Sequence, residues 1–418
     1  FGFRKGKSTE QAINYVLYSI EKWKAKKIDV ALILLDFSKA FDLIDHEILL
    51  DKLTKFGFTY KAKKLIASYL ENRRMAVRVN GKTSVEKWIG PAGCPQGSCL
   101  GPLLYLIYTA DLISCLQDTT LGESLDISIF ADDTSIVVPN PTKENLREIL
   151  SKAEKYASNN KLKLNMAKTE LVCTKDLGSI TVTNQKIEIH NQASSVKYLC
   201  VYLNLKGTWD DHMKEIKRKM MAGIRALYKI RGAAPKKVLI NIYNCLVKSH
   251  LTYAMSSWGG TLTNGQLYEL EKVQNLAVRC FENLSGPIHF TNIKKAHGIL
   301  KPKELAISSV VNYLLTATSR SNKLSPLQAH FKVQETKTRQ QLSVLPLYKG
   351  PTLKYHAKIA RVYHLNWNLE LKQNTIMKRV NYSLLEDYKS GCEKDNCYVC
   401  LNMQNQKKRQ EQIIVEIT

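Results

Sequence analysis

Hydrophobic and polar positions follow a strand pattern early in the chain. The run VALILLDF at 30–37 is apolar except for Asp36 near its end, which is typical of a strand covered on both faces. A helix should follow, with Asp45 as its N-cap and Gly57 just past its end. Four apolar side chains are expected on the inner face of this helix: Leu49, Leu50, Leu53 and Phe56.

Three further segments place β-prone residues on both sides of turn signals. At 68–90 the Asn80-Gly81 pair predicts an exposed, basic hairpin. At 126–139 the pattern predicts a hairpin with two adjacent acids at its turn. KYLCVYLNLKG at 197–207 predicts another hairpin.

Helical periodicity interrupts these hairpins and then takes over. A glycine- and proline-rich segment leads into an apolar helix at 93–112, and Thr142 can cap a helix at 142–158. This order of strand, helices, hairpins and short strands is typical of an α+β layer fold. Beyond Trp209 the pattern is helical, with basic residues on the outer faces, which predicts a small bundle and one later helix near 303–318. The apolar positions of the bundle include Met213, Ile216, Met220, Ile224 and Leu227, and then Leu267, Leu270, Val273, Ala277 and Phe281.

The composition fits sizeable cores and a polyanionic partner. Of 418 residues, 44% are hydrophobic, and apolar runs such as LLYLIY are too short to span a bilayer. The chain begins at Phe1 without a signal region, so we expect a soluble fragment of something longer. The net charge is +25, with 28 basic and 22 acidic residues in 1–205 and 34 and 15 in 206–418. This excess favours nucleic acid, and a solvated, lysine-rich surface is the alternative.

Ten cysteines are scattered along the chain, mostly within apolar patterns, which favours a reducing compartment over a disulfide scaffold. Only Cys392, Cys397 and Cys400 cluster. A structural zinc site needs four ligands, and the nearest preceding histidine is His364. Loosely packed thiols are therefore the alternative to a zinc site.

Asp132 and Asp133 are the first candidates for chemistry. Adjacent acids at a hairpin tip have an ordinary explanation, because aspartate favours turns. Asp36 changes this interpretation, since a carboxylate at the end of a buried strand is costly unless a metal or hydrogen bonds compensate it. If that strand lies beside the hairpin, three acids converge, and such hard oxygen ligands suit Mg²⁺ or Mn²⁺. Two such ions about 3.5–4 Å apart can activate an attacking 3′-hydroxyl and stabilise the leaving oxygen of a phosphoryl displacement.

Five segments, in this order and spacing, resemble motifs A to E of a reverse transcriptase. They are DFSKAFDLIDHEIL, PAGCPQGSCLGPLLYLIYTADL, FADDTSIVV, LNMAKTELV and KYLCVYL. GFRKGKST near the start and YAMSSWGG further on resemble the non-long-terminal-repeat, LINE-type retrotransposon group, in particular its jockey-like elements. The resemblance covers about residues 1–285.

The resemblance implies a right-hand polymerase. An α+β palm, an antiparallel sheet with helices, would occupy 1–205 together with partial fingers. A helical thumb would occupy 206–285, followed by a basic C-terminal region of unknown role at 286–418. The implied activity is RNA-directed DNA synthesis, by two-metal nucleotidyl transfer from deoxynucleoside triphosphates to a primer 3′-hydroxyl. The alternative is a non-catalytic nucleic-acid-binding remnant of a decayed or domesticated element.

Carried onto this sequence, the family's metal-binding aspartates fall at Asp36 and Asp132, with Asp133 completing the catalytic set. The Phe37 carbonyl would help to hold one metal. Phe41 matches the family's steric gate against the ribose 2′-hydroxyl, and core packing is its ordinary role. The bulky ring also argues against viral RNA-dependent RNA polymerases, which usually have an acid at this place. Asp42 lies one position too late for that role and is assigned as a surface acid.

Gln96 matches the family's residue near the incoming nucleotide and template, and Gly97 would let the backbone approach closely. A glycine turn before a helix is the alternative. Lys168 matches the lysine of motif D, which could protonate or stabilise the pyrophosphate leaving group. A solvated lysine is the alternative.

Two predicted hairpins would contact nucleic acid. Tyr198 and Leu199 fall in the family's primer grip, where relatives commonly have glycine in place of Cys200, and we expect this difference to be tolerated. The basic hairpin is assigned to the fingers. Its arginines could contact template phosphates: Arg73, Arg74 and Arg78.

The resemblance also implies partners. These are an RNA template, a DNA primer or target DNA, and deoxynucleoside triphosphates, without a membrane. Further fingers sequence and an endonuclease are expected upstream in the full-length polypeptide. The expected location is intracellular, in the nucleus at the site of action and in a cytoplasmic ribonucleoprotein.

Overall fold

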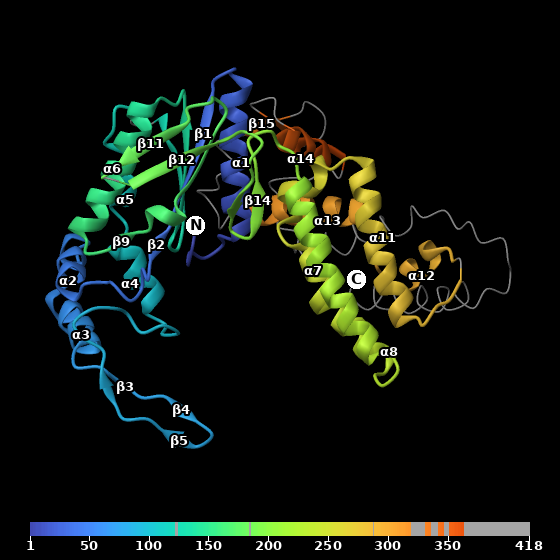
Figure 1. Ribbon diagram of the computed structural model, residues 1–418, viewed down its shortest axis with the longest axis horizontal. Helices are drawn as coiled ribbons and strands as arrows, with labels where there is room; N and C mark the ends of the chain where they lie inside the picture. The colour runs from blue at the N-terminus through green and yellow to red at the C-terminus, as the bar shows by residue number, and fades with distance from the viewer. Residues whose placement is uncertain are drawn as a thin grey trace. The chain divides into compact units, whose positions relative to one another are not determined.

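The computed structural model describes residues 1–121, 124–183, 185–286, 288–318, 331–335, 342–346 and 351–362 (Figure 1). The chain divides into two compact units, Phe1–Thr208 and Trp209–Thr418. The boundary lies close to the one predicted after residue 205. The cysteine cluster at 392–400 lies outside the described residues.

A sheet of mixed orientation forms the centre of the first unit. Its strand order is β11-β12-β10-β1-β8-β7. All neighbouring strands pair antiparallel except β10 and β12, which run parallel. The prediction of an antiparallel sheet is corrected at this pair, because the chain crosses from β10 to the edge strand β11 and returns through β12. The strands are β1 (Val30–Leu35), β7 (Asp126–Phe130), β8 (Asp133–Pro139), β10 (Glu170–Cys173), β11 (Ser179–Val182) and β12 (Gln185–Asn191).

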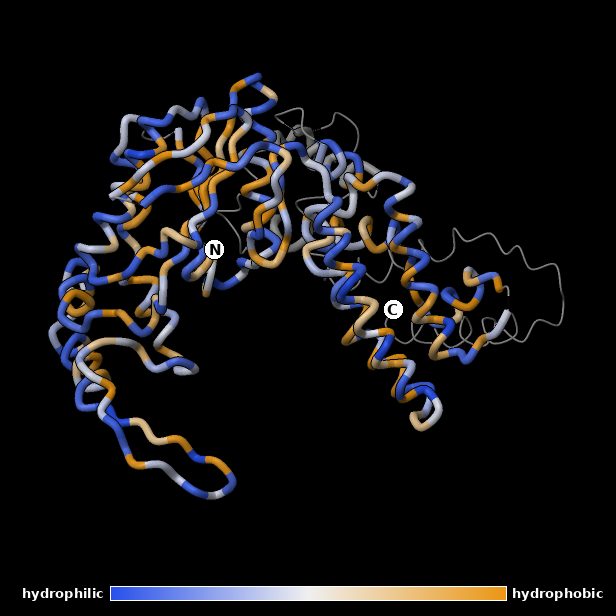
Figure 2. Tube along the Cα trace, viewed as in Figure 1, coloured by the Kyte–Doolittle hydropathy of each residue, from blue (hydrophilic) through white to orange (hydrophobic). Residues whose placement is uncertain are grey.

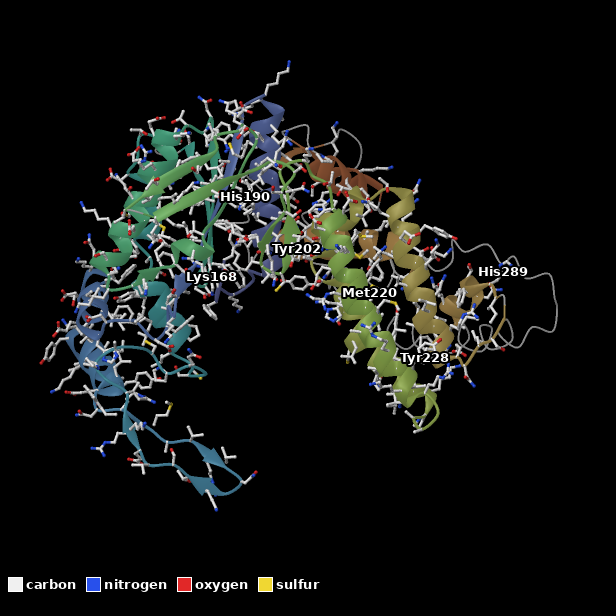
Figure 3. The ribbon with its side chains drawn as sticks, in the orientation of Figure 1. Lys168, His190, Tyr202, Met220, Tyr228 and His289 are labelled. Atoms are coloured by element: carbon white, nitrogen blue, oxygen red, sulfur yellow. The ribbon has the colours of Figure 1, made fainter. Side chains whose placement is uncertain are left out.

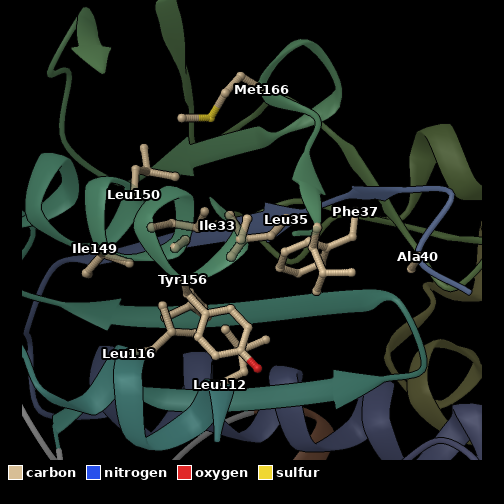
Figure 4. Packing of buried hydrophobic residues seen from close by; sticks show 14 of the residues in the cluster. Ile33, Leu35, Phe37, Ala40, Leu112, Leu116, Ile149, Leu150, Tyr156 and Met166 are labelled. Atoms are coloured by element: carbon tan, nitrogen blue, oxygen red, sulfur yellow. The ribbon is translucent and has the colours of Figure 1, made fainter. Parts of the chain in front are cut away.

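The central strand β1 is buried along its whole length, as its continuous apolar run predicts. Ile33 and Leu35 share one core cluster with Ile149 and Leu150 of α6 (Lys143–Asn159) (Figure 4). Helix α1 (Thr9–Ala25) packs against β1, β7 and β8. The sequence pattern did not predict α1, because its buried face includes polar residues: Gln11, Asn14 and Ser19.

Local capping signals place two of the helices as predicted. Asp45 caps α2 (His46–Lys55) by accepting a hydrogen bond of 3.0 Å from the Ile48 amide, and Thr142 forms a capping box on α6. Phe56, predicted on the inner face of α2, is instead 55% exposed, because it is the C-cap and follows the last helical residue. Helix α3 (Tyr60–Leu70) follows and was not predicted.

An ion pair between the buried Lys52 and the exposed Asp111 links α4 (Gly101–Tyr108) and the start of α5 (Leu112–Gln117) to α2. Lys52 is 7% exposed, and its ammonium donates to the Tyr108 carbonyl at 2.5 Å and to Asp111 at 2.7 Å. Burial lowers the pKa of Lys52, and the Asp111 carboxylate opposes that shift. Removing Asp111 would leave the buried Lys52 charge without its ionic partner, which is costly.

The basic hairpin forms around Asn80 and Gly81 as predicted. Both residues have positive φ, +48° and +79°, as a type I′ turn requires. The ribbon projects away from the sheet (Figure 1), and every residue of its strands is exposed. The strands are β3 (Arg74–Met75), β4 (Arg78–Val79), β5 (Lys82–Thr83) and β6 (Lys87–Trp88).

The predicted hairpin at 197–207 has the same kind of turn without glycine. Strands β13 (Val196–Tyr198) and β14 (Val201–Leu203) pair through Tyr198 and Val201, which leaves Leu199 and Cys200 as the turn. Their φ angles are +44° and +65°. A side chain with a Cβ is disfavoured in this left-handed region, so the turn stores backbone strain.

Replacing Cys200 by glycine should therefore stabilise the first unit by about 1 kcal/mol, because glycine adopts positive φ without steric cost. Urea unfolding followed by a probe in the first unit would measure the change. Cys99→Gly is the control, since Cys99 is exposed and is not among the residues with positive φ. An equal effect of both substitutions would refute the strain argument.

The described part of the second unit is built mainly from helices, as predicted, with one two-stranded sheet. In α7 (Asp210–Ile230), hydrophobic residues recur between hydrophilic ones (Figure 2), and Met213, Ile216, Met220, Ile224 and Leu227 are all buried. Helix α7 packs against α11 (Asn264–Phe281). The other described elements are α8 (Lys236–Tyr243), the π-helix η3 (Asn244–Lys248), α9 (Ser249–Thr252), α10 (Met255–Trp258), η4 (Gly259–Thr261), α12 (Phe290–Ala296), α13 (Pro302–Thr318), β15 (Phe331–Glu335), β16 (Leu342–Pro346) and α14 (Pro351–Val362).

The structure joins the helices on the two sides of residue 285, where the sequence analysis placed a boundary. The buried Gln274 amide on α11 donates to the Leu300 carbonyl at 3.0 Å. The buried His356 ring on α14 forms a 2.7 Å hydrogen bond with the Ser256 carbonyl on α10. These contacts make the predicted thumb and the following helices one unit. Among the described residues, no helix is both long and apolar enough to cross a membrane.

Candidate active site

The register of the sheet brings the three predicted aspartates to one edge. The pairing of β1 with β8 ends at Leu35 and Thr134, so Asp36 and Asp133 are the next residue on each strand. Phe130 and Asp133 close the β7–β8 hairpin, which leaves Ala131 and Asp132 as its two turn residues. The order of strands in the sheet therefore places residues almost a hundred positions apart next to each other.

The acidic turn is strained and is supported from the start of the chain. Ala131 has φ +55°, in the left-handed region that a Cβ disfavours. Gly2 lies directly against this turn, since a Cβ added there would come within 2.5 Å of the Ala131 nitrogen. Sequence reasoning missed this role of Gly2. The signal was a glycine in GFRKGKST, whose contact with residue 131 no local pattern reveals.

The three carboxylates interact electrostatically. Burial, followed by the charges of Asp132 and Asp36, raises the pKa of Asp133 above its usual range. Lys168 lies near them, with its ammonium 3.9 Å from the Asp36 carboxylate and its side chain 71% exposed (Figure 3). This exposure means that solvent screens the pair, so the cation offsets only part of the repulsion.

The backbone fixes the segment that carries Lys168. Lys168 ends the short helix η2 (Met166–Lys168), and the Asn165 amide donates to the Asp36 carbonyl at 2.8 Å. Strands β2 (Phe37–Ser38) and β9 (Lys163–Leu164) pair beside it. Phe37 thus follows Asp36 directly, with its side chain buried and its backbone next to Leu164.

The donor chemistry of these residues fits a hard divalent cation. Asp36, Asp132 and Asp133 supply carboxylate oxygens. Burial and then the charges of Asp132 and Asp36 raise the pKa of Asp133, and a cation would relieve the repulsive part of this effect. Among the residues that the structure describes, no three His, Cys, Asp or Glu side chains are already grouped to hold a metal. The aspartates therefore form an acidic edge rather than a finished coordination shell.

Phe41 lies against aromatic residues beside this edge. Its ring stacks on Tyr105 of α4, with centroids 4.5 Å apart, and meets Phe3 edge-on at 6.0 Å. Burial, and then the charges of Asp132 and Asp133, raises the pKa of the Tyr105 hydroxyl. Phe3 follows Gly2, which lies against the Ala131 turn, so the Phe41 ring lies close to the acidic turn. Phe41 therefore both packs against the core and lies beside the acids. Sequence reasoning missed Tyr105, because an apolar helical run such as the one around it is typical of ordinary core.

Gln96 and Gly97 lie on the loop before α4. Gly97 has φ +80°, which favours glycine, and open space around it. Both a glycine turn and the close approach of a ligand to the backbone are compatible with this geometry. Gln96 is exposed, and its amide nitrogen donates to the Asp42 carboxylate at 3.0 Å. Asp42 is exposed, as its assignment as a surface acid predicts, and the structure pairs it with Gln96.

The residues predicted to bind nucleic acid lie in different settings. Tyr198 is 2% exposed, its hydroxyl lies 3.2 Å from that of Ser128, and burial raises its pKa to about 12. Its ring therefore anchors the hairpin to β7 and is not available at the surface, while Leu199 is at the turn. Arg73 donates to the Tyr69 carbonyl at 3.1 Å. Arg74 and Arg78 lie exposed on the projecting ribbon.

Comparisons with known proteins agree with the motifs. Residues 1–203 match the family model described as reverse transcriptase (RNA-dependent DNA polymerase). The chain is 28% identical over 308 residues to a probable RNA-directed DNA polymerase from transposon BS of Drosophila melanogaster, covering 71% of this chain and 33% of that protein. It is 27% identical over 326 residues to the RNA-directed DNA polymerase from mobile element jockey of the same species, covering 73% and 34%. The chain thus spans about a third of the length of these curated relatives.

Solved telomerase structures are also similar to this chain. Telomerase from Candida albicans, in complex with the TWJ fragment of telomeric RNA, matches at a TM-score of 0.36 with 12% identity, covering 76% of this chain and 53% of that one. Apo telomerase from Candida tropicalis matches at 0.36 with 11% identity, covering 77% and 56%.

Proposed function

Because residues 1–203 are a reverse transcriptase domain related to those of LINE-type, non-long-terminal-repeat retrotransposons, we propose that this chain is an RNA-directed DNA polymerase. It would add deoxynucleotides to a primer 3′-hydroxyl on an RNA template and release pyrophosphate. The observation that carries this proposal is the meeting of Asp36, Asp132 and Asp133 at one edge of the sheet.

Asp36 and Asp132 would hold the divalent ions, Mg²⁺ or Mn²⁺, with Asp133 and the Phe37 carbonyl beside them. Such ions, when bound, supply charge neutralisation and activation of the attacking hydroxyl. The protein's own part is to fix Asp132 and Asp133 on the β7–β8 hairpin and Asp36 at the end of β1, so that the carboxylates need little rearrangement. Phe41 would exclude a ribose 2′-hydroxyl from the space beside this edge.

Lys168 would stabilise negative charge that develops on the leaving group. Lys168→Met should lower the rate of single-nucleotide addition about tenfold, less than the roughly 100-fold or more typical of such a group, because the side chain is largely exposed. Rapid-quench kinetics would measure it. Lys186→Met, on the exposed side of β12, is the matched control and should leave the rate unchanged. Equal rates in the two variants would rule out this role.

The proposed partners are an RNA template, a DNA primer and deoxynucleoside triphosphates. The charge of +25 supports a polyanionic partner, and the exposed Arg74 and Arg78 are suited to template phosphates. An endonuclease upstream in the full-length polypeptide would prepare target DNA as primer. Use of chromosomal target DNA would place the reaction in the nucleus, after assembly of a cytoplasmic ribonucleoprotein.

Primer extension tests the proposed function. The chain is incubated with a primed RNA template, deoxynucleotides and Mg²⁺, with and without a chelator, and beside Asp132→Ala. Extension that requires metal and Asp132 supports the polymerase. Salt-sensitive RNA binding, indifferent to metal and deoxynucleotide and without extension, would favour a non-catalytic nucleic-acid-binding remnant.

A further inference from the structure

Asp42 and Gln96 form a polar contact between two segments that are distant in the sequence. The Gln96 amide nitrogen donates to one oxygen of the Asp42 carboxylate at 3.0 Å. Asp42 immediately follows Phe41, and Gln96 precedes α4, which carries Tyr105. The contact therefore joins the two segments whose aromatic rings stack beside the acidic edge.

The backbone holds these segments together independently of the two side chains. The Cys94 amide donates to the Phe41 carbonyl at 2.9 Å, and the Gly93 amide donates to the Ile44 carbonyl at 2.7 Å. Gly93 has φ +91°, and a Cβ there would lie 3.0 Å from the Asp42 carbonyl oxygen. Since the main chains are already in place, the side-chain hydrogen bond orders only two exposed groups.

The chemistry of the pair determines how the Gln96 amide is turned. An ionised carboxylate only accepts hydrogen bonds, so the NH₂ group of Gln96 must point toward Asp42. The amide oxygen then points away from Asp42 and remains an acceptor. Without the carboxylate, the amide of an exposed glutamine could rotate and offer either group.

We propose that Asp42 is a positioning residue, which fixes the Gln96 amide so that its oxygen accepts a hydrogen bond from the incoming deoxynucleotide. The proposal rests on the proposed function, since it takes the nucleotide as the ligand beside Gln96. Asp42 itself does not touch the nucleotide. Its loss should therefore weaken nucleotide binding without slowing the chemical step.

Single-nucleotide extension with the full chain tests this role. Asp42→Leu removes the acceptor, Asp42→Asn keeps an acceptor oxygen, and Asp51→Leu changes an exposed acid on α2 as the matched control. We expect Asp42→Leu to raise KM for the deoxynucleotide about fivefold to tenfold with kcat nearly unchanged, and Asp42→Asn to restore most of the loss. In a Gln96→Leu background, addition of Asp42→Leu should cause no further rise, because Asp42 acts only through the Gln96 amide.

A second measurement reports the contact without requiring turnover. In protein labelled with ¹⁵N-glutamine, the side-chain amide signal of Gln96, assigned through Gln96→Leu, should shift in Asp42→Leu and stay in place in Asp51→Leu. No shift in Asp42→Leu, or a KM equal to that of the control, would overturn the proposal. A shifted signal in a chain that extends no primer would refute the proposed function, and the positioning role with it, while leaving the contact itself established.

Discussion

Replacing Asp132 by asparagine should lower the rate of nucleotide addition by about 1000-fold or more. The change removes one negative oxygen ligand from the acidic edge, and metal ions in such sites contribute several kcal/mol of transition-state stabilisation. The side chain keeps its size, so the two-residue turn that it shares with Ala131 should persist. Rapid-quench extension of a primed RNA template, at saturating deoxynucleotide and Mg²⁺, would measure the rate.

Asp118→Asn is the matched control, because Asp118 is an acid with an 86% exposed side chain that pairs with Lys152. It should extend primers at the normal rate. RNA binding should be normal in both variants, since neither residue lies on the basic hairpin. An Asp132→Asn variant with substantial activity would contradict the assignment of the metal ligands.

The same substitution should leave the metal-free protein as stable as before, or slightly more stable. Burial and the neighbouring charges of Asp132 and Asp36 raise the pKa of Asp133 in the folded state. A carboxyl whose folded pKa lies above its unfolded value binds protons more tightly when folded, so stability falls as the pH rises from the unfolded pKa through the folded pKa. At a pH above both pKa values of Asp133, the folded protein carries the repulsion among the three carboxylates. Removal of the Asp132 charge relieves part of this repulsion. Thermal unfolding with a chelator, near neutral pH, would detect the difference.

Replacing Phe41 by valine should reduce discrimination against ribonucleotides by about 100-fold, which is within the range that side-chain bulk contributes to a pocket. The phenyl ring stacks on Tyr105 beside the acidic edge, and its loss would open space for a 2′-hydroxyl. The measurement is the ratio of kcat/KM for a deoxynucleotide to that for the matching ribonucleotide. The change in this ratio should come from a higher kcat/KM for the ribonucleotide.

Phe58→Val is the control for lost packing, since Phe58 is also partly buried against the same core cluster. Both variants should lose about 1–2 kcal/mol of stability, because each leaves a cavity around a half-buried ring. Only Phe41→Val should change the nucleotide ratio. If it lowered kcat/KM for both nucleotides equally, the ring would be a packing residue and not a gate.

Short-range signals allowed much of the local structure to be predicted. The apolar run at 30–37 predicted β1, and Asn80-Gly81 predicted a turn with positive φ. Asp45 and Thr142 predicted helix caps. Each depends on interactions among residues close in sequence. Helix α1 escaped prediction because burial of its polar residues is decided by the strands that it covers.

Local motifs were enough to identify the residues that could carry the chemistry, because each motif is a short segment and their order can be read along the chain. The tertiary structure alone decided which of them meet. The register of β1 on β8 places Asp36 beside Asp133. The packing of α4 stacks the Tyr105 ring on Phe41. A loop contact joins the Gln96 amide to the Asp42 carboxylate. Burial of Tyr198 beneath its hairpin was decided in the same way. These contacts join residues far apart in sequence, so their geometry depends on how whole elements pack rather than on any local preference.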